Sequence, residues 1–341
     1  MTNGKGTGSS ASNMKITLIT PAPPNSRHGN RVTAIRWARI LRRLGHSVNV
    51  KQAYDGEHLE LLIALHALRS HSSIARVHRD HPDIPIVVAL TGTDLYRDLQ
   101  RSKRAQQSLD LATRIIVLQP KALEALRPRW REKTHVIYQS VEALTDKAHT
   151  SSARPSASAA PRTFDVCVIG HLRTVKDPFR AAMAARLLPE SSRIRVIQAG
   201  AAMTRQQELR ALAEMKTNPR YQWLGEQTSS RTRRTMSRSR LSVLSSRLEG
   251  GANALGEAII AGIPVLASRI PGSVGILGED YAGYFETGAT AELARLMTRA
   301  ETDPVFLREL KRACDQLVEL FDPVREEASW LQLLDELLEV T

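Results

Sequence analysis

Short apolar runs alternate with segments of helical periodicity along the first part of the chain. Residues 30–44 have the spacing of an amphipathic helix, and its expected inward residues are Val32, Ile35, Leu41 and Leu44. The expected strands are residues 15–20, 47–53, 61–65, 84–90, 114–118 and 135–138. Strands that alternate with helices in this way predict a parallel, doubly wound sheet.

The composition changes at residue 146. The stretch DKAHTSSARPSASAAPRT, residues 146–163, is rich in Ser, Ala and Pro, has no hydrophobic period and is typical of a linker. A second alternating set follows, with expected strands at residues 164–169, 194–198, 221–224, 241–245 and 264–268. We therefore expect an α/β chain with a disordered tail (1–13), an N-terminal Rossmann-like domain (14–145), the linker, and a C-terminal Rossmann-like domain (164–341).

Composition narrows the class of protein. A chain of 341 residues can bury two separate cores. No apolar run is long enough to span a bilayer, and the N-terminus lacks the apolar core of a signal peptide. Cys167 lies in a strand-like run and Cys314 in a helical stretch, and both are expected to be buried thiols of a reducing cytosol. These features predict a cytoplasmic protein without stable membrane insertion.

The formal net charge of +13 favours anionic ligands. The densest basic segment contains Arg231, Arg233, Arg234, Arg238 and Arg240. No aromatic residue lies between these arginines to stack on bases, so we interpret them as a solvated helix face, with nucleic-acid binding as an alternative.

The segment SSRLEGGANALGEAIIAGIPVLAS, residues 245–268, carries two glutamates around a glycine pair. Gly250 and Gly251 can adopt positive φ and allow close approach of a ligand, and Asn253 is a good N-cap for the following helix. That helix would direct its free N–H groups at an anion. Glu257 can then reach ribose hydroxyls and Glu249 can face a sugar, although the spacing alone equally allows two unrelated surface glutamates.

A second basic motif, IGHLRTVKDP at residues 169–178, follows an expected strand. Its side chains should therefore lie at the carboxyl edge of the sheet, where ligands bind in this class of fold. Gly170, Arg173 and Lys176 are the candidate residues. Ordinary surface cations are disfavoured here because cations at a helix N-terminus oppose its dipole.

The N-terminal half contains three further candidate ligand-binding loops. Gly29, Asn30 and Arg31 open the first expected helix, and the exposed helix N–H groups beside an amide and a guanidinium suit a small oxyanion. His66 follows a strand and is equally compatible with a structural role. The loop LTGTDLY supplies hydroxyls, a glycine and a carboxylate at the same edge, from Thr91, Gly92, Thr93 and Asp94.

The E-x7-E pattern followed by AGIPVLAS resembles the donor site of GT-B glycosyltransferases of the large retaining family 4. The resemblance implies two Rossmann-like domains that face each other across a cleft, with a last helix at residues 323–338 that packs back on the first domain. It implies that the first domain holds the acceptor, which makes its three loops the candidate acceptor loops. It also implies that Glu257 binds the ribose, that Glu249 contacts the donor sugar, and that an Arg–Lys pair stabilises the leaving diphosphate without a metal. His171 stands at the position of that arginine, so we expect Arg173 to replace it, and EGGAN departs from the usual family pattern, which leaves donor-sugar preference open.

Four segments, ITPAPPNSRHGNRVTAIRWARIL, ALHALRSHSSI, VALTGTDLYRDL and IGHLRTVKDPFRAA, resemble the selenosugar synthases of bacterial selenoneine biosynthesis. The resemblance implies that selenophosphate attacks a UDP-sugar, UDP-N-acetylglucosamine or UDP-glucose, with release of UDP and phosphate. The expected partners are small-molecule substrates, with no cofactor, metal or nucleic acid; the oligomeric state is left open. Two alternatives remain: a family 4 enzyme with a lipid or glycan hydroxyl acceptor, and a basic nucleic-acid-binding protein on a GT-B scaffold.

Overall fold

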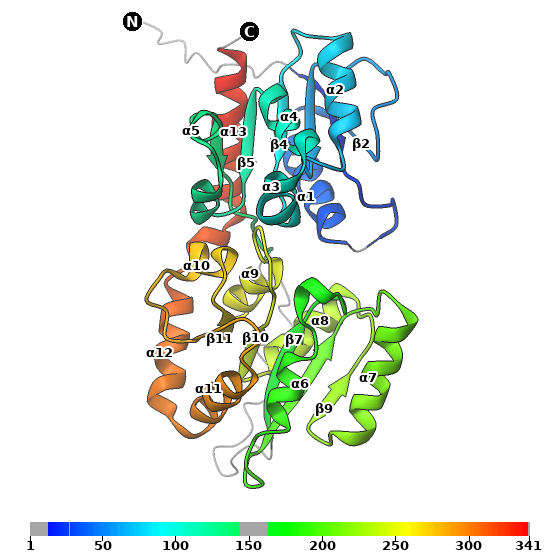
Figure 1. The fold of residues 1–341 in the computed structure, drawn as a ribbon. Coiled ribbons are helices and arrows are strands. Elements are labelled where there is room, and N and C mark those ends of the chain that lie inside the picture. The colour runs from blue at the N-terminus through cyan, green and yellow to red at the C-terminus, as the bar shows by residue number, and fades with distance from the viewer. Residues whose placement is uncertain (1–12, 27, 143–162, 340–341) are drawn as a thin grey trace, which may run out of the picture. The chain divides into compact units, whose positions relative to one another are not determined.

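The computed structural model describes residues 13–26, 28–142 and 163–339, and the chain divides into two compact units (Figure 1). The first unit contains residues 1–117, 123–137 and 327–341, and the second contains residues 118–122 and 138–326. Apart from residues 13 and 163, the expected tail (1–13) and linker (146–163) lie outside the described residues.

The first unit is built on a six-stranded sheet in the order β2-β1-β3-β4-β5-β6, with every pair parallel. Its strands are β1 (Lys15–Ile19), β2 (Ser47–Lys51), β3 (Leu61–Leu65), β4 (Ile86–Ala89), β5 (Arg114–Val117) and β6 (Thr134–Val136). Its helices are α1 (Gly29–Arg43), α2 (His71–Asp80), α3 (Leu99–Arg101), α4 (Lys103–Leu111), α5 (Pro128–Arg131) and most of α13 (Pro323–Leu338). The strand order reverses between β1 and β3, which is the switch point of this sheet. Ligands are therefore expected to bind at the carboxyl ends of these two strands.

The buried face of α1 differs from the expected one. Val32 and Ile35 are 41% and 39% exposed, and Leu44 lies just past the helix end and is half-buried. The helix instead turns Trp37 into the core, where its ring meets Trp330 of α13 edge-on at a centroid distance of 5.0 Å. Of the inward residues expected, only Leu41 is buried. Burial of the large indole outweighs burial of the smaller side chains, since the gain grows with the apolar area removed from water.

The second unit contains another six-stranded parallel sheet, in the order β12-β11-β10-β7-β8-β9. Its strands are β7 (Phe164–Ile169), β8 (Ile194–Ala199), β9 (Tyr221–Trp223), β10 (Leu241–Leu244), β11 (Val265–Ser268) and β12 (Tyr284–Phe285). Its helices are α6 (Arg180–Ala185), α7 (Arg205–Thr217), α8 (Ser229–Arg238), α9 (Asn253–Ile260), α10 (Pro271–Leu277), α11 (Thr290–Thr302) and α12 (Pro304–Asp315). This is the strand order of dinucleotide-binding domains, with the switch point between β7 and β10.

The core of the second unit contains both cysteines. Cys167 in β7 and Cys314 in α12 are fully buried and unpaired with each other, and burial raises the pKa of both thiols. A raised pKa keeps a thiol protonated and unreactive. The expectation that both are buried thiols is confirmed.

The Trp37–Trp330 contact gives a stability prediction for the first unit. We expect Trp330→Ala to lower the free energy of unfolding by about 3–5 kcal/mol, because a fully buried indole is lost and a cavity remains. Trp330→Phe should cost less than about 1.5 kcal/mol, since it keeps an aromatic ring and removes an indole N–H that has no partner within the described residues. Urea unfolding followed by circular dichroism measures both. Leu331→Ala on the same helix is the control, since Leu331 is 40% exposed, and an equal loss in that variant would contradict the packing role of Trp330.

Candidate functional site

Two loops of the second unit meet at the switch point between β7 and β10. The backbone N–H of Arg247 donates to the carbonyl of Val175 at 2.8 Å, and the hydroxyl of Ser245 donates to the carbonyl of Asp177 at 3.0 Å. The loop after β7 and the loop after β10 are thereby joined. The two motifs that the sequence singled out at residues 169–178 and 245–268 therefore form one site.

An ion pair between Lys176 and Glu249 lies inside this site. The hydroxyl of Ser246 also donates to Oε1 of Glu249, at 2.6 Å, and only 8% of Glu249 is exposed. The start of α10 packs on the same residue: a Cβ at Gly272 would lie 2.3 Å from the carbonyl oxygen of Glu249. The carboxylate of Glu249 is thus held by two donors, and the backbone of the same residue lies in close contact with α10.

Arg173, the second cation of the motif at residues 169–178, has a different environment from that of Lys176. Arg173 is half-buried, and its guanidinium makes no hydrogen bond or ion pair with the described residues. The neighbouring His171 accepts a hydrogen bond at Nδ1 from the N–H of Ala201, at 3.1 Å, which requires that nitrogen to be unprotonated. Of these two residues, Arg173 is therefore the one whose cationic group is available to an anion.

A small pocket opens between these loops. It is lined by the apolar ends of β7 and β10 together with polar groups from Gly170, His171, Lys176, Gln198, Ser245 and Ser246. Gln198 was not predicted from the sequence. It is 1% exposed, and its Oε1 accepts a hydrogen bond from the Tyr221 hydroxyl at 2.6 Å. Burial raises the pKa of Tyr221, so that hydroxyl stays protonated and able to donate.

The amide nitrogen of Gln198 has no hydrogen-bond partner within the described part of the chain. Gln198 is paired in register with Val168, another residue of the pocket wall. A buried amide donor without a partner is costly unless a water or ligand accepts from it. The wall of the pocket therefore contains a residue whose amide donor is unused within the described residues.

The glycine pair and Asn253 do not act as expected. Neither Gly250 nor Gly251 has positive φ, and a Cβ at Gly251 would lie 2.6 Å from Cβ of Leu118. Glycine is therefore needed there for close packing rather than for a left-handed turn. Helix α9 begins at Asn253 itself, with Ala252 as the N-cap and no side-chain cap. Glu257 lies one turn into this helix and is half-buried.

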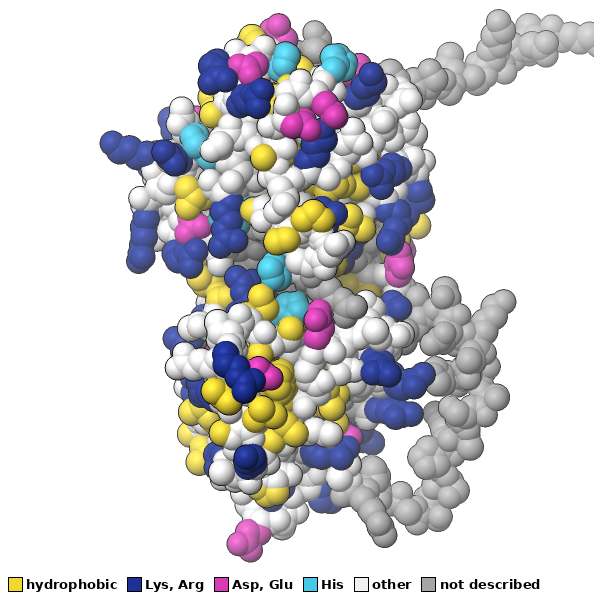
Figure 2. Space-filling view, turned by 90° about the vertical axis from the view of Figure 1, so that its right-hand side faces the viewer, with side chains coloured by type: hydrophobic (Ala, Val, Ile, Leu, Met, Phe, Trp, Pro, Cys, Tyr) yellow, Lys and Arg dark blue, Asp and Glu magenta, His cyan; other side chains and the backbone are white. Residues whose placement is uncertain are grey.

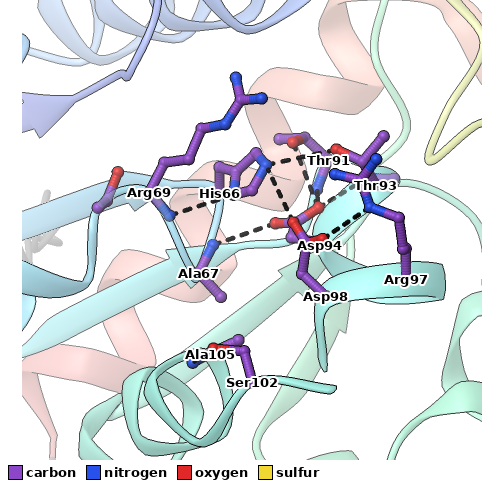
Figure 3. A network of polar contacts seen from close by, with 12 residues as sticks. His66, Ala67, Arg69, Thr91, Thr93, Asp94, Arg97, Asp98, Ser102 and Ala105 are labelled. Atoms are coloured by element: carbon purple, nitrogen blue, oxygen red, sulfur yellow. Dashed lines mark hydrogen bonds and ion pairs between the residues drawn. The ribbon is translucent and has the colours of Figure 1, made fainter. Parts of the chain in front are cut away.

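In the first unit, a buried carboxylate organises two of the candidate acceptor loops (Figure 3). Asp94 is fully buried and accepts hydrogen bonds from the backbone N–H groups of Thr91 (2.9 Å), Gly92 (2.9 Å) and Ala67 (3.1 Å). The loop after β3 is thereby joined to the loop after β4. Asp94 positions these loops and does not face solvent.

His66 belongs to the same network. Its φ of 72° is unusual for a residue other than glycine, and it is 1% exposed. Its Nε2 lies 3.3 Å from the hydroxyl of Thr93 and 3.7 Å from Oδ2 of Asp98. The N–H of Arg69 donates to Nδ1 of His66 at 3.4 Å, and Figure 3 shows the exposed side chain of Arg69 extending away from the network. Asp98 and Arg69 were not predicted from the sequence, because they have no distinctive spacing.

The third candidate loop leads from β1 into α1. Gly29, Asn30 and Arg31 form the first turn of α1, which contains no acidic residue and has no side-chain cap from His28. Arg31 is half-buried, and its guanidinium makes no contact with another polar group of the described residues. Because β1 and β3 are neighbours, this turn and His66 lie at the same edge of the sheet, on the two sides of its switch point.

Two further features are absent from the part of the chain that the structure describes. Within residues 13–26, 28–142 and 163–339, no three His, Cys, Asp or Glu side chains cluster in a way that could hold a metal ion. In the same residues, no helix has the length and apolar character required to cross a membrane.

Comparison with known proteins agrees with this geometry. Residues 152–317 match the family described as glycosyl transferases group 1. The structure of HepE from Anabaena, solved with UDP and glucose, has a TM-score of 0.73 and 17% identity and covers 95% of this chain and 100% of its own.

Two other solved structures are similar over nearly the full length. Sucrose-phosphate synthase from Thermosynechococcus elongatus has a TM-score of 0.74 and 15% identity and covers 96% of this chain and 99% of its own. A glycosyltransferase from Rickettsia africae ESF-5 has a TM-score of 0.69 and 12% identity, with coverage of 97% and 100%. These likenesses confirm the expected GT-B fold. Residues 152–317, most of which lie in the second unit, are therefore similar to the glycosyl transferases group 1 family, and the chain has the GT-B fold.

Proposed function

We propose that this protein transfers a sugar from a UDP-sugar to selenophosphate and so forms a carbon–selenium bond. The observation that carries the donor half is the arrangement of Lys176, Glu249 and the uncompensated Arg173 at the switch point of the second sheet. The bound UDP and glucose in the similar HepE structure support a UDP-sugar as the donor.

The diphosphate of the donor would be received by Arg173 and Lys176. Lys176 is held by Glu249 in the described state, so a diphosphate would share or take over an ammonium that is already positioned. Cations aimed at the leaving group stabilise the charge that develops on it as the bond to the sugar breaks. Glu257 would bind the ribose, and Glu249 would also contact the sugar.

The acceptor half is supported by the charge and shape of the first turn of α1. Arg31 has no acidic partner among the described residues, and the helix N-terminus has no acidic residue in its first turn. Such a turn suits a small anion with several oxygens. The loops joined by Asp94 and His66 would complete the acceptor side, with Thr91, Gly92 and Thr93 as neighbouring polar groups.

The reaction balances without a cofactor. The ionised selenium of selenophosphate forms a bond to the anomeric carbon of the sugar, while the bond from that carbon to the diphosphate oxygen breaks and UDP leaves. Water then cleaves the selenium–phosphorus bond to give the selenosugar and phosphate. An ionised selenium nucleophile needs little general-base help, so the site's main task is to bind and orient anions.

The first test is product analysis. Purified protein with UDP-N-acetylglucosamine or UDP-glucose and selenophosphate should release UDP and yield a sugar with the isotope pattern of selenium by mass spectrometry. Inorganic phosphate in place of selenophosphate is the control and should give no selenium-bearing product. Turnover on a lipid or glycan hydroxyl without any selenosugar would contradict the proposed acceptor, and salt-sensitive binding of nucleic acid without UDP binding would contradict the enzyme itself.

A second test addresses Arg173. We expect Arg173→Ala to lower kcat/KM about 10- to 100-fold, because it removes a charge-assisted contact worth roughly 1.5–3 kcal/mol. Arg308→Ala is the matched control, since Arg308 is an exposed arginine on α12. Unchanged kcat/KM in the Arg173 variant would show that it does not replace the family arginine.

A third test separates the two substrate sites by steady-state kinetics. Glu257→Ala should raise KM for the UDP-sugar several-fold, and Arg31→Ala should raise KM for selenophosphate while that for the UDP-sugar stays unchanged. The physical reason is that a lost ground-state contact affects the substrate that makes it. Equal increases in the KM for the UDP-sugar in both variants would contradict this division.

A further inference from the structure

Helix α7 presents an apolar stripe to solvent. Leu209, Leu212 and Met215 are 51%, 41% and 37% exposed, and their spacing of three residues places them along one side of the helix. Figure 2 shows hydrophobic side chains gathered on this face of the second unit, with basic and acidic side chains at the margin. The helix buries only Ala211 among its own residues. This is a larger exposed apolar surface than a helix that serves only to cover its own sheet requires.

The opposite flank of α7 is already occupied. Glu214 pairs with Arg186 at 2.8 Å, and the guanidinium of Arg210 lies 4.3 Å from the ring centre of Phe179. These contacts fix α7 against the segment around α6. Because α7 packs on β9, the edge strand of the sheet, the apolar stripe faces outward beyond that edge.

We propose that the stripe is a docking surface for a second copy of this chain, in a two-fold dimer formed by antiparallel α7 helices. With Leu212 facing Leu212 of the second copy, Leu209 would meet Met215, and Glu208 would meet Lys216. Glu208 and Lys216 lie one turn before and one turn after Leu212 on the same side of the helix. The face is therefore complementary to itself in both apolar character and charge, as a two-fold contact requires.

The same charges argue against a lipid surface as the occupant. Glu208 lies beside the stripe and is paired with Arg205 at 2.7 Å, so part of the basic margin is neutralised. A helix that lies on an anionic membrane normally has Lys and Arg along its polar margin and no carboxylate next to the inserted residues. A single pair of helices of this length buries less than the roughly 1,200 Å² of a stable interface, so the dimer should be weak and dependent on concentration.

Sedimentation velocity of the full chain from about 1 to 200 µM tests the proposal, with the dimer expected to appear as the concentration rises in this weak range. Leu212→Glu places carboxylates next to the two-fold axis and should keep the protein monomeric throughout. Val305→Glu is the matched control, because Val305 is 65% exposed on α12, away from the stripe, and this variant should dimerise like the parent. Circular dichroism should show the same fold in both variants.

Charge exchange gives an independent test of the antiparallel register. Glu208→Lys and Lys216→Glu should each weaken dimerisation at least several-fold, and the double variant should restore it. A parent chain that stays monomeric at all concentrations would overturn the proposal. So would dimerisation that Leu212→Glu leaves intact, or binding of the monomer to phosphatidylglycerol vesicles that Leu212→Glu abolishes.

Discussion

The buried carboxylate of Glu249 is the constraint on which the proposed donor site depends. A carboxylate that is nearly removed from water is stable only when donors or cations replace the lost hydration. Lys176 and Ser246 supply them, and Ser246 is itself held by the Ser268 hydroxyl, which donates to its carbonyl. Residues from the loop after β7, the loop after β10 and the end of β11 thus cooperate to stabilise one buried carboxylate. The ammonium of Lys176 is in this way held in place by the protein itself, which is what electrostatic stabilisation of a leaving group in the proposed reaction would require.

The first unit organises its loops with a carboxylate too, but by different means. Asp94 is held by three backbone N–H groups and no cation, so its bonds define the path of two loops without binding a neighbouring cation. Arg31 and Arg69 make no ion pair among the described residues, whereas Arg97 pairs with Asp98 at 2.8 Å. The same element, a buried acid at the carboxyl edge of a parallel sheet, therefore fixes a cation in the second unit and leaves Arg31 and Arg69 available in the first.

The strands were predictable because they are short apolar runs that a parallel sheet buries on both faces. Their bounds agree with the expected ranges to within two residues, whereas β12 was missed because its two residues, Tyr284 and Phe285, form no pattern. The prediction of the buried face of α1 was wrong because periodicity gives Val32 and Ile35 the same weight as Trp37. The sequence does not show that Trp37 has a partner, Trp330, in the last helix. The motifs at Lys176 and Glu249 were found for their chemistry, but their ion pair was not, since 73 residues separate them. Gln198 could not be found at all: a single glutamine in a buried strand has no spacing signal, and its partner Tyr221 belongs to another strand.

The position of α7 relative to the sheet separates the proposed dimer surface from the proposed donor site. The loops of the proposed donor site follow β7 and β10 in the middle of the sheet, whereas α7 covers β9 at the edge, with β8 between. A partner that packs on the outward side of α7 approaches in the direction away from the switch point. The exposed stripe therefore lies beyond the edge of the sheet, away from the pocket beside Gln198 and Lys176. A parallel sheet can present two such surfaces because its ligand site depends on strand ends and its free edge depends only on strand order.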